Sequence, residues 1–413
     1  MSPSERNCDV LIVGGGLVGT ALACALADLP LDTLLVEAHE VRQLTQPSFD
    51  QRVTALASGS QRILAGLGLW HSLQSHAEAI RSIHISEQGR FGAARIHAEE
   101  EGVAALGYTI ENQALGRVLW ESLKGKPRFR ALAPARMRSL ETSEHGVTAQ
   151  IESGGEELTV HAKLLVAADG ERSWVRRALG AAVREDDYAQ AAVILNCSTE
   201  SAPAGRAFER FTPTGPVAFL PLTAGRAAVI WTLPAATAAR VMQLSPSEFR
   251  DELQAVFGYR LGRITRVGER HVHDLARVVS EPLQQPRAVL IGNAALSLHP
   301  VAGQGFNLAL RDVATLAEVI ADRLRESELP ADVGAGDLLD RYRQWRADDQ
   351  RRVSRFTHGL IRLFGDSAPG LGIGRGLGLM AFDLLPGAKA LLARQTMGRA
   401  GRLPRLARGL RLG

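Results

Sequence analysis

The hydrophobic pattern at the start of the chain predicts a strand, a helix and a second strand in succession. Residues 8–13 form a short apolar run that is typical of a buried strand, and three glycines follow it. Residues 17–28 then have the spacing of a helix, and residues 33–37 are β-branched and leucine-rich, as in a strand. The uncharged stretch Val10–Ala27 also has the length of a membrane span or a signal peptide, but acidic residues precede it and glycines interrupt it. We therefore predict a βαβ unit.

The pattern changes twice further along the chain. Between Tyr188 and Arg287, apolar segments separated by Gly and Pro turns are typical of an antiparallel sheet, and an apolar strand near Ala288 then resumes the first kind of pattern. The unit that opens the chain is therefore predicted to be discontinuous, with a separate layer inserted into it. The elements predicted after the first unit are helices at 112–123, 307–323 and 338–356, and strands within 147–169 and at 191–197, 216–222, 226–233 and 288–291.

The composition excludes several classes of protein. The chain has 413 residues, of which 46% are hydrophobic, so it is long enough for two or three domains with a buried core, and wholesale disorder is excluded. Three scattered cysteines are too few for a disulfide framework or a zinc site, which favours a cytoplasmic protein with no structural metal. Six arginines lie from Arg394 onward, and subtracting them from the net charge of +4 leaves −2 for the rest of the chain. A uniformly basic nucleic-acid-binding protein is therefore not expected.

The first chemical motif is Gly14-x-Gly16-x-x-Gly19, which follows the first predicted strand and opens the first helix. Glycines at these positions permit a tight turn, let backbone N–H groups approach a pyrophosphate, and bring the helix close to the strand. Glu37 ends the next strand 18 residues after Gly19, where a carboxylate accepts hydrogen bonds from ribose hydroxyls. The motif therefore predicts a site for FAD or NAD, because an acid would repel a 2′-phosphate. Glycine turns in an ordinary α/β core are the alternative.

Two further glycine-containing motifs follow predicted strands. Asp169-Gly170 ends an apolar strand pattern, although Asp-Gly is also a common turn. Gly292-Asn293 follows another apolar strand and begins a glycine-rich loop that leads into a helix. Such a loop offers a ring of N–H donors and the positive end of a helix to an anionic ring edge or a phosphate.

The three motifs together resemble those of the FAD-dependent aromatic hydroxylases of the para-hydroxybenzoate hydroxylase type. In that family the glycine triad binds the ADP half of FAD, the Asp-Gly motif lies near the pyrophosphate, and a Gly-Asp motif binds the ribityl chain. The resemblance narrows to the ubiquinone-biosynthesis hydroxylases, because residues 298–312 read LHPVAGQGFNLALRD. Gly292-Asn293 stands where the family has Gly-Asp, and this variant is especially similar to the 2-octaprenyl-6-methoxyphenol hydroxylases. The similarity runs from about Cys8 to Gln395.

The resemblance implies an α/β fold with a discontinuous Rossmann-like FAD-binding domain, an inserted substrate domain with a mixed or antiparallel sheet, and a helical C-terminal region. The implied boundaries are residues 1–75, 111–187 and 287–330 for the FAD-binding domain, 76–110 and 188–286 for the substrate domain, and 331–413 for the C-terminal helices and basic tail.

The activity that the resemblance implies is a monooxygenase reaction with FAD as cofactor and NAD(P)H and O2 as cosubstrates. The ring of a prenylated methoxyphenol in ubiquinone biosynthesis would be hydroxylated by way of a flavin hydroperoxide. The prenylated phenol is thus the implied substrate. Peripheral contact with the inner membrane surface and association with other ubiquinone-biosynthesis proteins are further implied interactions.

The resemblance also implies roles for the loop that follows Gly292-Asn293. Pro300 is expected to form a wall beside the flavin where oxygen reacts. The backbone N–H groups of Gly303, Gln304 and Gly305 are expected to stabilise the negative charge of the reduced flavin, and a helix beginning at Asn307 is expected to add its positive end.

Five further residues each have two interpretations. Arg52 and Arg117 either contact the flavin or its pyrophosphate or are surface arginines. His299 is a candidate general base, but we favour a structural hydrogen bond because proline follows it in the flavin loop. Trp231 and Phe219 either line a substrate pocket or belong to the core, and we favour the core.

The C-terminal tail and the function each leave alternatives open. Arginines recur every three residues from Arg399 to Arg411 among leucines, which is typical of an interfacial helix at anionic lipid. Glycines and Pro404 weaken such a helix, so a solvated tail is the alternative. For the function, the alternatives are a hydroxylase of the same fold acting on another aromatic substrate, a non-flavin NAD-dependent dehydrogenase, and a non-catalytic scaffold with a lipid-binding tail.

Overall fold

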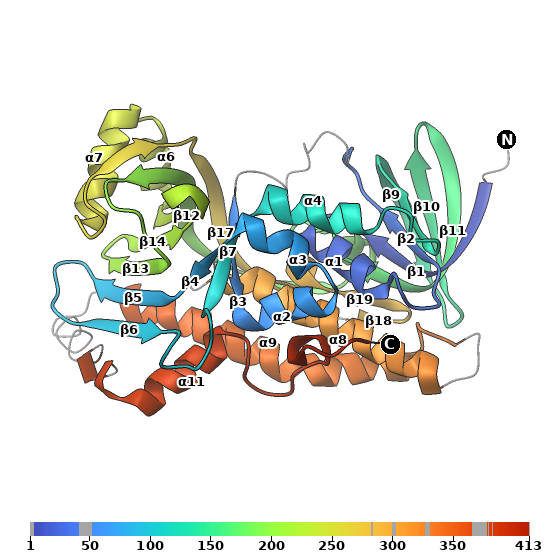
Figure 1. Cartoon of the computed structure of the whole chain (residues 1–413). Helices are drawn as coiled ribbons and strands as arrows, with labels where there is room; N and C mark the ends of the chain where they lie inside the picture. The colour runs from blue at the N-terminus through green and yellow to red at the C-terminus, as the bar shows by residue number, and fades with distance from the viewer. Residues whose placement is uncertain are drawn as a thin grey trace.

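The chain builds two large β-sheets and a small third sheet, with long helices packed along them (Figure 1). The computed structural model describes residues 4–40, 52–281, 284–299, 303–326, 331–365, 378, 380–381 and 383–412. The second sheet, with α6 (Ala235–Met242) and α7 (Pro246–Phe257), lies at the left of Figure 1, and the first sheet lies at the right. Helices α8 (Gln304–Glu326) and α9 (Gly336–Gly365) run along the lower side of the view.

The first sheet is mainly parallel and is built from distant parts of the chain. Its central order is β18-β19-β11-β1-β2-β8, in which β19, β11, β1, β2 and β8 run parallel to one another. β9 and β10 extend the sheet antiparallel to β11. These strands are β1 (Ser4–Val13), β2 (Thr33–Val36), β8 (Phe129–Leu132), β9 (Ala135–Thr142), β10 (Val147–Ser153), β11 (Glu156–Ala167), β18 (Gln284–Gln285) and β19 (Ala288–Leu290).

Strand β1 is buried on both faces, as a central parallel strand requires. Val10 and Ile12 pack into one hydrophobic cluster with α8 and with α1 (Leu17–Leu26), while Leu11 packs into a second cluster on the other face. The βαβ unit predicted from the first forty residues is therefore confirmed, with β1 extended to Ser4 at its N-terminal end. None of the described helices combines the length and the apolar character that crossing a bilayer requires.

The second sheet is mostly antiparallel and has the order β20-β17-β12-β15-β14-β13-β5-β6, with β16 paired to β12. Its longest strand extends from Ala182 to Thr199, whereas only 191–197 was predicted, because the first half of this strand is charged and pairs with β17. Its strands are β5 (Ser82–Glu87), β6 (Ala93–His97), β12 (Ala182–Thr199), β13 (Arg206–Thr212), β14 (Gly215–Pro221), β15 (Ala227–Pro234), β16 (Ile264–Val267), β17 (His271–Glu281) and β20 (Leu296–Ser297).

One face of the second sheet is covered by α6 and α7. Phe249, Leu253 and Phe257 of α7 pack against alternate residues of the strands, including Phe219 and Trp231. The favoured prediction that these two aromatic residues belong to the core is confirmed, since they are 1% and 2% exposed.

A small sheet and several short helices connect the two large sheets. The small sheet has the order β3-β7-β4, and β4 contacts β14 of the second sheet. Its strands are β3 (Val53–Ala57), β4 (Ala77–Ile80) and β7 (Gly107–Glu111), and the remaining helices are α2 (Ser58–Gly66), α3 (Trp70–Leu73), η3 (Gln74–His76), α4 (Asn112–Ser122), α5 (Trp174–Ala178), η4 (Thr223–Gly225), η5 (Gly292–Ala294), α11 (Pro386–Thr396) and η7 (Leu406–Arg408).

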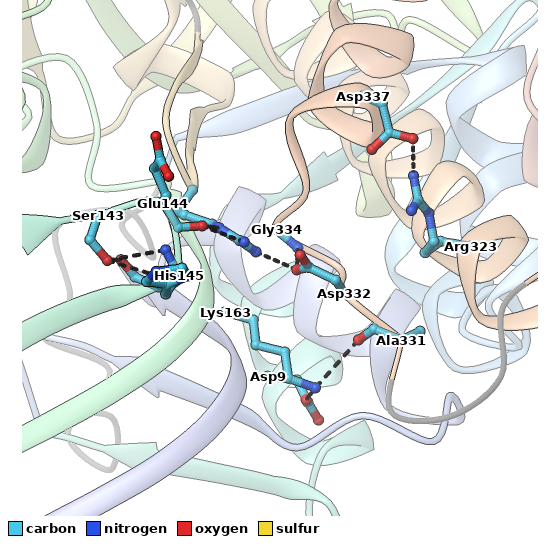
Figure 2. Close-up of polar contacts among 12 residues, drawn as sticks. Asp9, Ser143, Glu144, His145, Lys163, Arg323, Ala331, Asp332, Gly334 and Asp337 are labelled. Carbon is cyan, nitrogen blue, oxygen red and sulfur yellow. Dashed lines mark hydrogen bonds and ion pairs between the residues drawn. The ribbon is translucent and has the colours of Figure 1, made fainter.

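Polar contacts fix the connection between α8 and α9 to the amino end of β19. Arg287, just before β19, donates a hydrogen bond to the carbonyl oxygen of Glu144 at 2.8 Å and forms an ion pair with Asp332 (Figure 2). Lys163 of β11 donates to the carbonyl oxygen of Ala331 at 3.3 Å. Ala331 and Asp332, shortly before α9, are thereby tied to the first sheet.

The C-terminal tail is docked on the body of the protein and is neither an interfacial helix nor a solvated tail. Leu406, Ala407 and Leu412 are buried in the same cluster as β1 and α8. Arg405 forms ion pairs with the buried carboxylates of Glu318 and Asp322 on α8. Both interpretations of the tail were therefore wrong, because its leucines supply core packing and one of its arginines neutralises buried acids.

The predicted fold class is confirmed: a discontinuous parallel-sheet unit carries an inserted, mainly antiparallel sheet and ends in a helical region.

Candidate functional site

Four neighbouring strands of the first sheet end in one row. Val13 of β1 pairs with Ala167 of β11 and with Val36 of β2, and Ala167 also pairs with Leu290 of β19. Because these strands are parallel, the loops after them leave the sheet at the same edge, which is where open α/β sheets bind ligands. The three sequence motifs and Glu37 follow these four residues within two positions. The structure thus brings together motifs that are distant in the sequence.

The first glycine turn lies against the loop that follows β11. Gly14 has a φ of +103°, and a Cβ atom there would stand 2.5 Å from the carbonyl oxygen of Ala168. A Cβ atom on Gly19 would stand 1.9 Å from the carbonyl oxygen of Gly14, so α1 approaches the turn as closely as backbone allows. Gly16, by contrast, caps α1 with a φ of −67°, which any residue adopts. Gly14 and Gly19 are therefore required by the fold, whereas the backbone conformation at Gly16 does not require a glycine.

Glu37 lies beside this turn and holds it in place. Its Oε2 atom accepts a hydrogen bond from the backbone N–H of Gly15 at 2.6 Å, and its Oε1 atom accepts one from the N–H of His39 at 2.8 Å. The indole of Trp120 on α4 donates to the carbonyl oxygen of Gly15 at 3.2 Å. A carboxylate has about four acceptor positions, so Glu37 retains capacity for ribose hydroxyls.

Asp169 bonds to the start of the short helix α5, whose N-cap residue is Ser173. Its Oδ1 atom accepts a hydrogen bond from the Ser173 hydroxyl at 2.5 Å, and its Oδ2 atom accepts one from the N–H of Val175 at 3.1 Å. Gly170 has a φ of +84°, and a Cβ atom there would meet no described residue within 4 Å. The Asp-Gly motif therefore shapes the loop through Asp169 and leaves open space at Gly170.

Arg176 was missed as a site residue, although it lies only seven residues after Asp169. Its guanidinium donates to the carbonyl oxygen of Ala294 at 3.1 Å and to that of Glu171 at 2.6 Å. Ser280 also donates to the carbonyl oxygen of Ala294, at 3.0 Å. The sequence held a signal for it, because Arg176 lies three residues after Ser173, the N-cap residue of α5, and is therefore one helical turn from that residue.

The third motif lies directly on the first. Gly292 is buried with a φ of +59°, and a Cβ atom there would stand 3.1 Å from both methyl groups of Val18 on α1. Asn293 is exposed, although Ala294 and Ala295 after it are buried. The Asn293 amide is therefore available to a ligand at the edge of the sheet.

The glycine loop before α8 is clamped to β3 by Asn307. The side-chain oxygen of Asn307 accepts a hydrogen bond from the N–H of Ala57 at 2.7 Å, and its side-chain nitrogen donates to the carbonyl oxygens of Ala55 and Gly303 at 2.8 and 2.7 Å. Helix α8 begins at Gln304, three residues before the predicted start at Asn307. Asn307 therefore lies in the first turn of the helix. The predicted contact of Asn307 with a cofactor remains a prediction, and its amide is used here to hold the loop.

The other predicted residues of this loop are placed at the same helix start. The Gln304 amide is buried and donates to the carbonyl oxygen of Thr396 at 3.3 Å. A Cβ atom on Gly305 would meet no described residue within 4 Å, so its backbone faces open space. Pro300 lies outside the described residues.

One of the two candidate arginines comes before β3 in the chain, and the other comes after β7. Arg52 precedes β3, and its carbonyl oxygen accepts a hydrogen bond from the N–H of Asn112 at the start of α4. Arg117 is exposed on α4. Their predicted contacts with the flavin remain predictions.

His299 is buried and electrically neutral at pH 7. Burial lowers its pKa to about 4, and its ring packs edge-on against Tyr188 with the centroids 5.2 Å apart. A histidine with such a low pKa is a weak general base. The structure therefore favours the structural interpretation of His299.

The residues at this edge fit FAD. The glycine turn of β1 presents the start of α1 to a diphosphate, and Glu37 retains acceptor positions for a ribose. Gly170, Asn293 and Gly305 border open space along the edge. The backbone N–H groups at the start of the long helix α8 suit an anionic ring edge without a basic side chain.

Comparisons with known proteins agree with this geometry. The FAD binding domain family model matches residues 7–357. Ubiquinone hydroxylase UbiL of Rhodospirillum rubrum is 36% identical over 413 residues, which cover 99% of this chain and 94% of that protein. The 3-demethoxyubiquinol 3-hydroxylase of Escherichia coli is 32% identical over 383 residues, which cover 92% of this chain and 96% of that protein.

A solved structure shares the fold over nearly the whole chain. The p-nitrophenol 4-monooxygenase PnpA of Pseudomonas putida superposes with a TM-score of 0.79 at 18% identity, covering 96% of this chain and 100% of that one. The family match and the two ubiquinone hydroxylase relatives show that the interpretations as a non-flavin dehydrogenase and as a non-catalytic scaffold are wrong. This chain belongs to the FAD-binding-domain family and, within it, to the ubiquinone hydroxylases, so it is a flavin-dependent aromatic monooxygenase.

Proposed function

We propose that this monooxygenase hydroxylates the ring of a prenylated methoxyphenol in ubiquinone biosynthesis, with NAD(P)H and O2 as cosubstrates. The names of the relatives in Rhodospirillum rubrum and Escherichia coli support a substrate of the ubiquinone pathway. The observation that carries the proposal is the row of strand ends at Val36, Val13, Ala167 and Leu290, which presents every predicted flavin motif at one edge. This arrangement supports the binding of one extended FAD molecule along that edge.

The chain's own residues bind and orient the reactants. Bound FAD, once reduced by NAD(P)H, supplies the two electrons and the activation of O2 that ring hydroxylation needs. Backbone N–H groups from Gly303 to Gly305 and the start of α8 stabilise negative charge at the flavin edge, as preorganised dipoles do. The expectation that Pro300 forms a wall beside the flavin comes from the resemblance alone. Exclusion of water at this position favours hydroxylation over wasteful release of peroxide.

The proposal is tested with the purified protein. We expect it to be yellow, to release FAD on denaturation, and to consume NAD(P)H faster when a prenylated methoxyphenol is added. In ¹⁸O2 the product should gain one labelled oxygen atom per NAD(P)H consumed. Colourless protein without FAD, or NAD(P)H oxidation that yields only peroxide with this phenol, would refute the proposed function.

The second candidate is a hydroxylase of the same fold that acts on another aromatic substrate. It predicts that a soluble aromatic acid is hydroxylated faster than the prenylated phenol under the same conditions. Analysis of the quinone intermediates that accumulate in a deletion strain separates the two candidates, because a block in ubiquinone synthesis leaves a prenylated phenol unconverted.

The proposed substrate also implies peripheral contact with the inner membrane surface, because a prenyl chain partitions into lipid. Association with other ubiquinone-biosynthesis proteins is part of the same proposal. Sedimentation of the holoenzyme with anionic vesicles that contain the prenylated phenol measures the first of these interactions.

A further inference from the structure

Glu209 is a lone carboxylate in an apolar row that crosses the second sheet. On β13, Glu209 pairs with Ile85 of β5 on one side and with Ala218 of β14 on the other. Residues paired in this way place their side chains on the same face of a sheet. From β6 to β12 the complete row is Ala94, Ile85, Glu209, Ala218, Ile230 and Ile194.

The face that carries Glu209 is the one that α6 and α7 leave uncovered. Phe208, the preceding residue of β13, points to the opposite face, where its ring packs against Phe257 of α7. Successive side chains of a strand alternate between faces, so Glu209 points away from the two helices. Ile85, Ile230 and Glu209 are each partly buried, so this face is apolar and only partly covered.

Two connections place this face beside the flavin loop. Ile83 and Ile96 lie two residues from Ile85 and Ala94 on their strands and therefore on the same face, and they pack against Met397 just after α11. The residue before it, Thr396, accepts the hydrogen bond from Gln304 at the start of α8. The small sheet gives the second connection, because β3 is bonded to Asn307 while β4 contacts β14.

The carboxylate of Glu209 has no hydrogen bond or ion pair among the described residues. A partly buried carboxylate without a partner is costly, and such groups are retained where they act on a ligand. Burial raises the pKa of Glu209 to about 7. A carboxylate with this pKa is half ionised near neutral pH and is a far stronger base than a surface glutamate.

Burial, and not a charged neighbour, is the cause of the raised pKa of Glu209. On the same face, Glu87 lies in the next row of β5, and His271 lies at the far end of the row on β17. Arg206 and Arg210 of β13, and Arg95 and His97 of β6, belong to the opposite face by alternation. β14 and β15 place only uncharged residues on the Glu209 face.

We propose that Glu209 contacts the ring hydroxyl of the phenol substrate and accepts its proton during hydroxylation. The inference rests on the proposed function and adds the residue that activates the ring. The phenol O–H bond breaks, its proton forms a bond to a carboxylate oxygen of Glu209, and the electron pair left on the phenol oxygen delocalises into the ring. Electron density rises at the ring carbons ortho and para to that oxygen, which are the positions that an electrophilic oxygen attacks.

The experiment compares Glu209→Gln with wild-type holoenzyme, using 2-prenylphenol and a ring-difluorinated 2-prenylphenol of lower phenol pKa as probes. We expect E209Q to retain its FAD. Its kcat for 2-prenylphenol should fall about 100-fold, which is within the range for loss of a general base. The loss should be much smaller for the difluorinated phenol, because that probe ionises more readily without help.

The pH profile separates proton transfer from a structural role. In the wild type, kcat/KM should rise with pH and level off above about pH 7, and E209Q should lose this rise. Glu209→Asp should keep the rise at a lower rate, and it replaces E209Q if that variant fails to bind FAD. Glu281→Gln, an exposed carboxylate of β17, is the matched control and should behave as wild type.

Three results would overturn the inference. E209Q with the wild-type rate and pH profile would show that Glu209 takes no proton. An equal loss for both phenols at every pH would assign Glu209 a structural role. If the wild type forms no hydroxylated product from either phenol, the proposed function fails and the inference fails with it. Product from the wild type together with an unchanged E209Q overturns the inference alone.

Discussion

The guanidinium of Arg176 donates a hydrogen bond to the carbonyl oxygen of Ala294 at 3.1 Å. This bond joins the loop after β11 to the loop after β19, which carry the second and third flavin motifs. Arg176 is only 6% exposed, so its bonds to backbone oxygens are protected from water. The relative placement of the two motifs therefore depends on one buried arginine as well as on strand pairing.

We expect Arg176→Met to weaken FAD binding and to lower the free energy of unfolding by about 1.5–3 kcal/mol, the range for a lost hydrogen bond to a charged group. Ser280 still donates to the Ala294 carbonyl oxygen, which keeps the cost at this level. The measurements are FAD per chain after gel filtration and urea unfolding of the apoprotein. Arg177→Met is the control, because Arg177 is exposed and its guanidinium donates to the carbonyl oxygen of Arg172, within the same loop. Equal FAD content in both variants would contradict the role of Arg176.

Gly14 and Gly16 should respond differently to substitution, although both belong to one motif. Gly14→Ala places a side chain at a φ of +103° and 2.5 Å from a carbonyl oxygen, so we expect a loss of about 3 kcal/mol or more and poor folding. Gly16→Val has an ordinary φ and should fold, but its side chain crowds the diphosphate and leaves apoprotein. Circular dichroism and released FAD distinguish the two outcomes. Normal FAD occupancy in Gly16→Val would show that the motif does not bind the cofactor.

The parts of the site that depend on local sequence were predictable. A buried strand followed by glycines and a helix has a distinct hydrophobic pattern along the sequence, so β1 and α1 were predicted within a few residues of their bounds. Gly292 was found because a glycine after an apolar strand indicates a turn, and its φ of +59° agrees. Parallel pairing then follows from the βαβ unit.

The remaining features depend on tertiary contacts that no local pattern carries. Glu209 is an ordinary polar position of an alternating strand, and its isolation emerges only from the register of β13 with β5 and β14. Arg405 belongs to an arginine repeat that resembles a membrane-binding helix, whereas its partners Glu318 and Asp322 lie on α8. The start of α7 could have been predicted from the sequence but was missed. Ser245 and Glu248 form a capping box there, which is a local signal for a helix start.

The docked tail should contribute to stability through its buried leucine. Leu406 is 1% exposed, and its Cδ2 atom lies 2.9 Å from the position of a Cβ atom on Gly66 of α2. We expect Leu406→Ala to lower the free energy of unfolding by about 2–5 kcal/mol, as for other buried leucines. Leu410→Ala, at a position 46% exposed, should change it by less than about 0.5 kcal/mol. Equal melting temperatures of the two variants would contradict docking of the tail.

Glu209 should also make stability depend on pH. Its pKa is about 7 in the folded protein, above the ordinary glutamate value of 4.5, so the folded state binds more protons than the unfolded state between these pH values. Stability is therefore highest below about pH 4.5 for this group and falls as pH rises through about 7, by at most about 3 kcal/mol. Glu209→Gln should remove this dependence and melt higher than wild type at pH 8. Thermal unfolding of E209Q, E281Q and wild type at pH 5 and pH 8 measures it, and parallel curves for all three would contradict the raised pKa.

Asn307 should be intolerant of even a nearly isosteric change. Its amide is 1% exposed and makes one bond as acceptor, to the N–H of Ala57, and two as donor, to the carbonyl oxygens of Ala55 and Gly303. Asn307→Ala leaves these buried groups without a partner and should cost about 2–4 kcal/mol.

Asn307→Asp keeps the acceptor for Ala57 but places a carboxylate oxygen less than 3 Å from the two carbonyl oxygens. Repulsion there should displace the start of α8, so FAD should be lost even when the variant is folded. Because protonation of the carboxyl restores one donor, N307D should recover part of its FAD as pH falls from 8 to 5, whereas N307A should not. Titration of each apoprotein with FAD, followed by flavin fluorescence, measures both affinities. Equal FAD affinity of N307D and wild type at pH 8 would show that the loop does not depend on the Asn307 clamp.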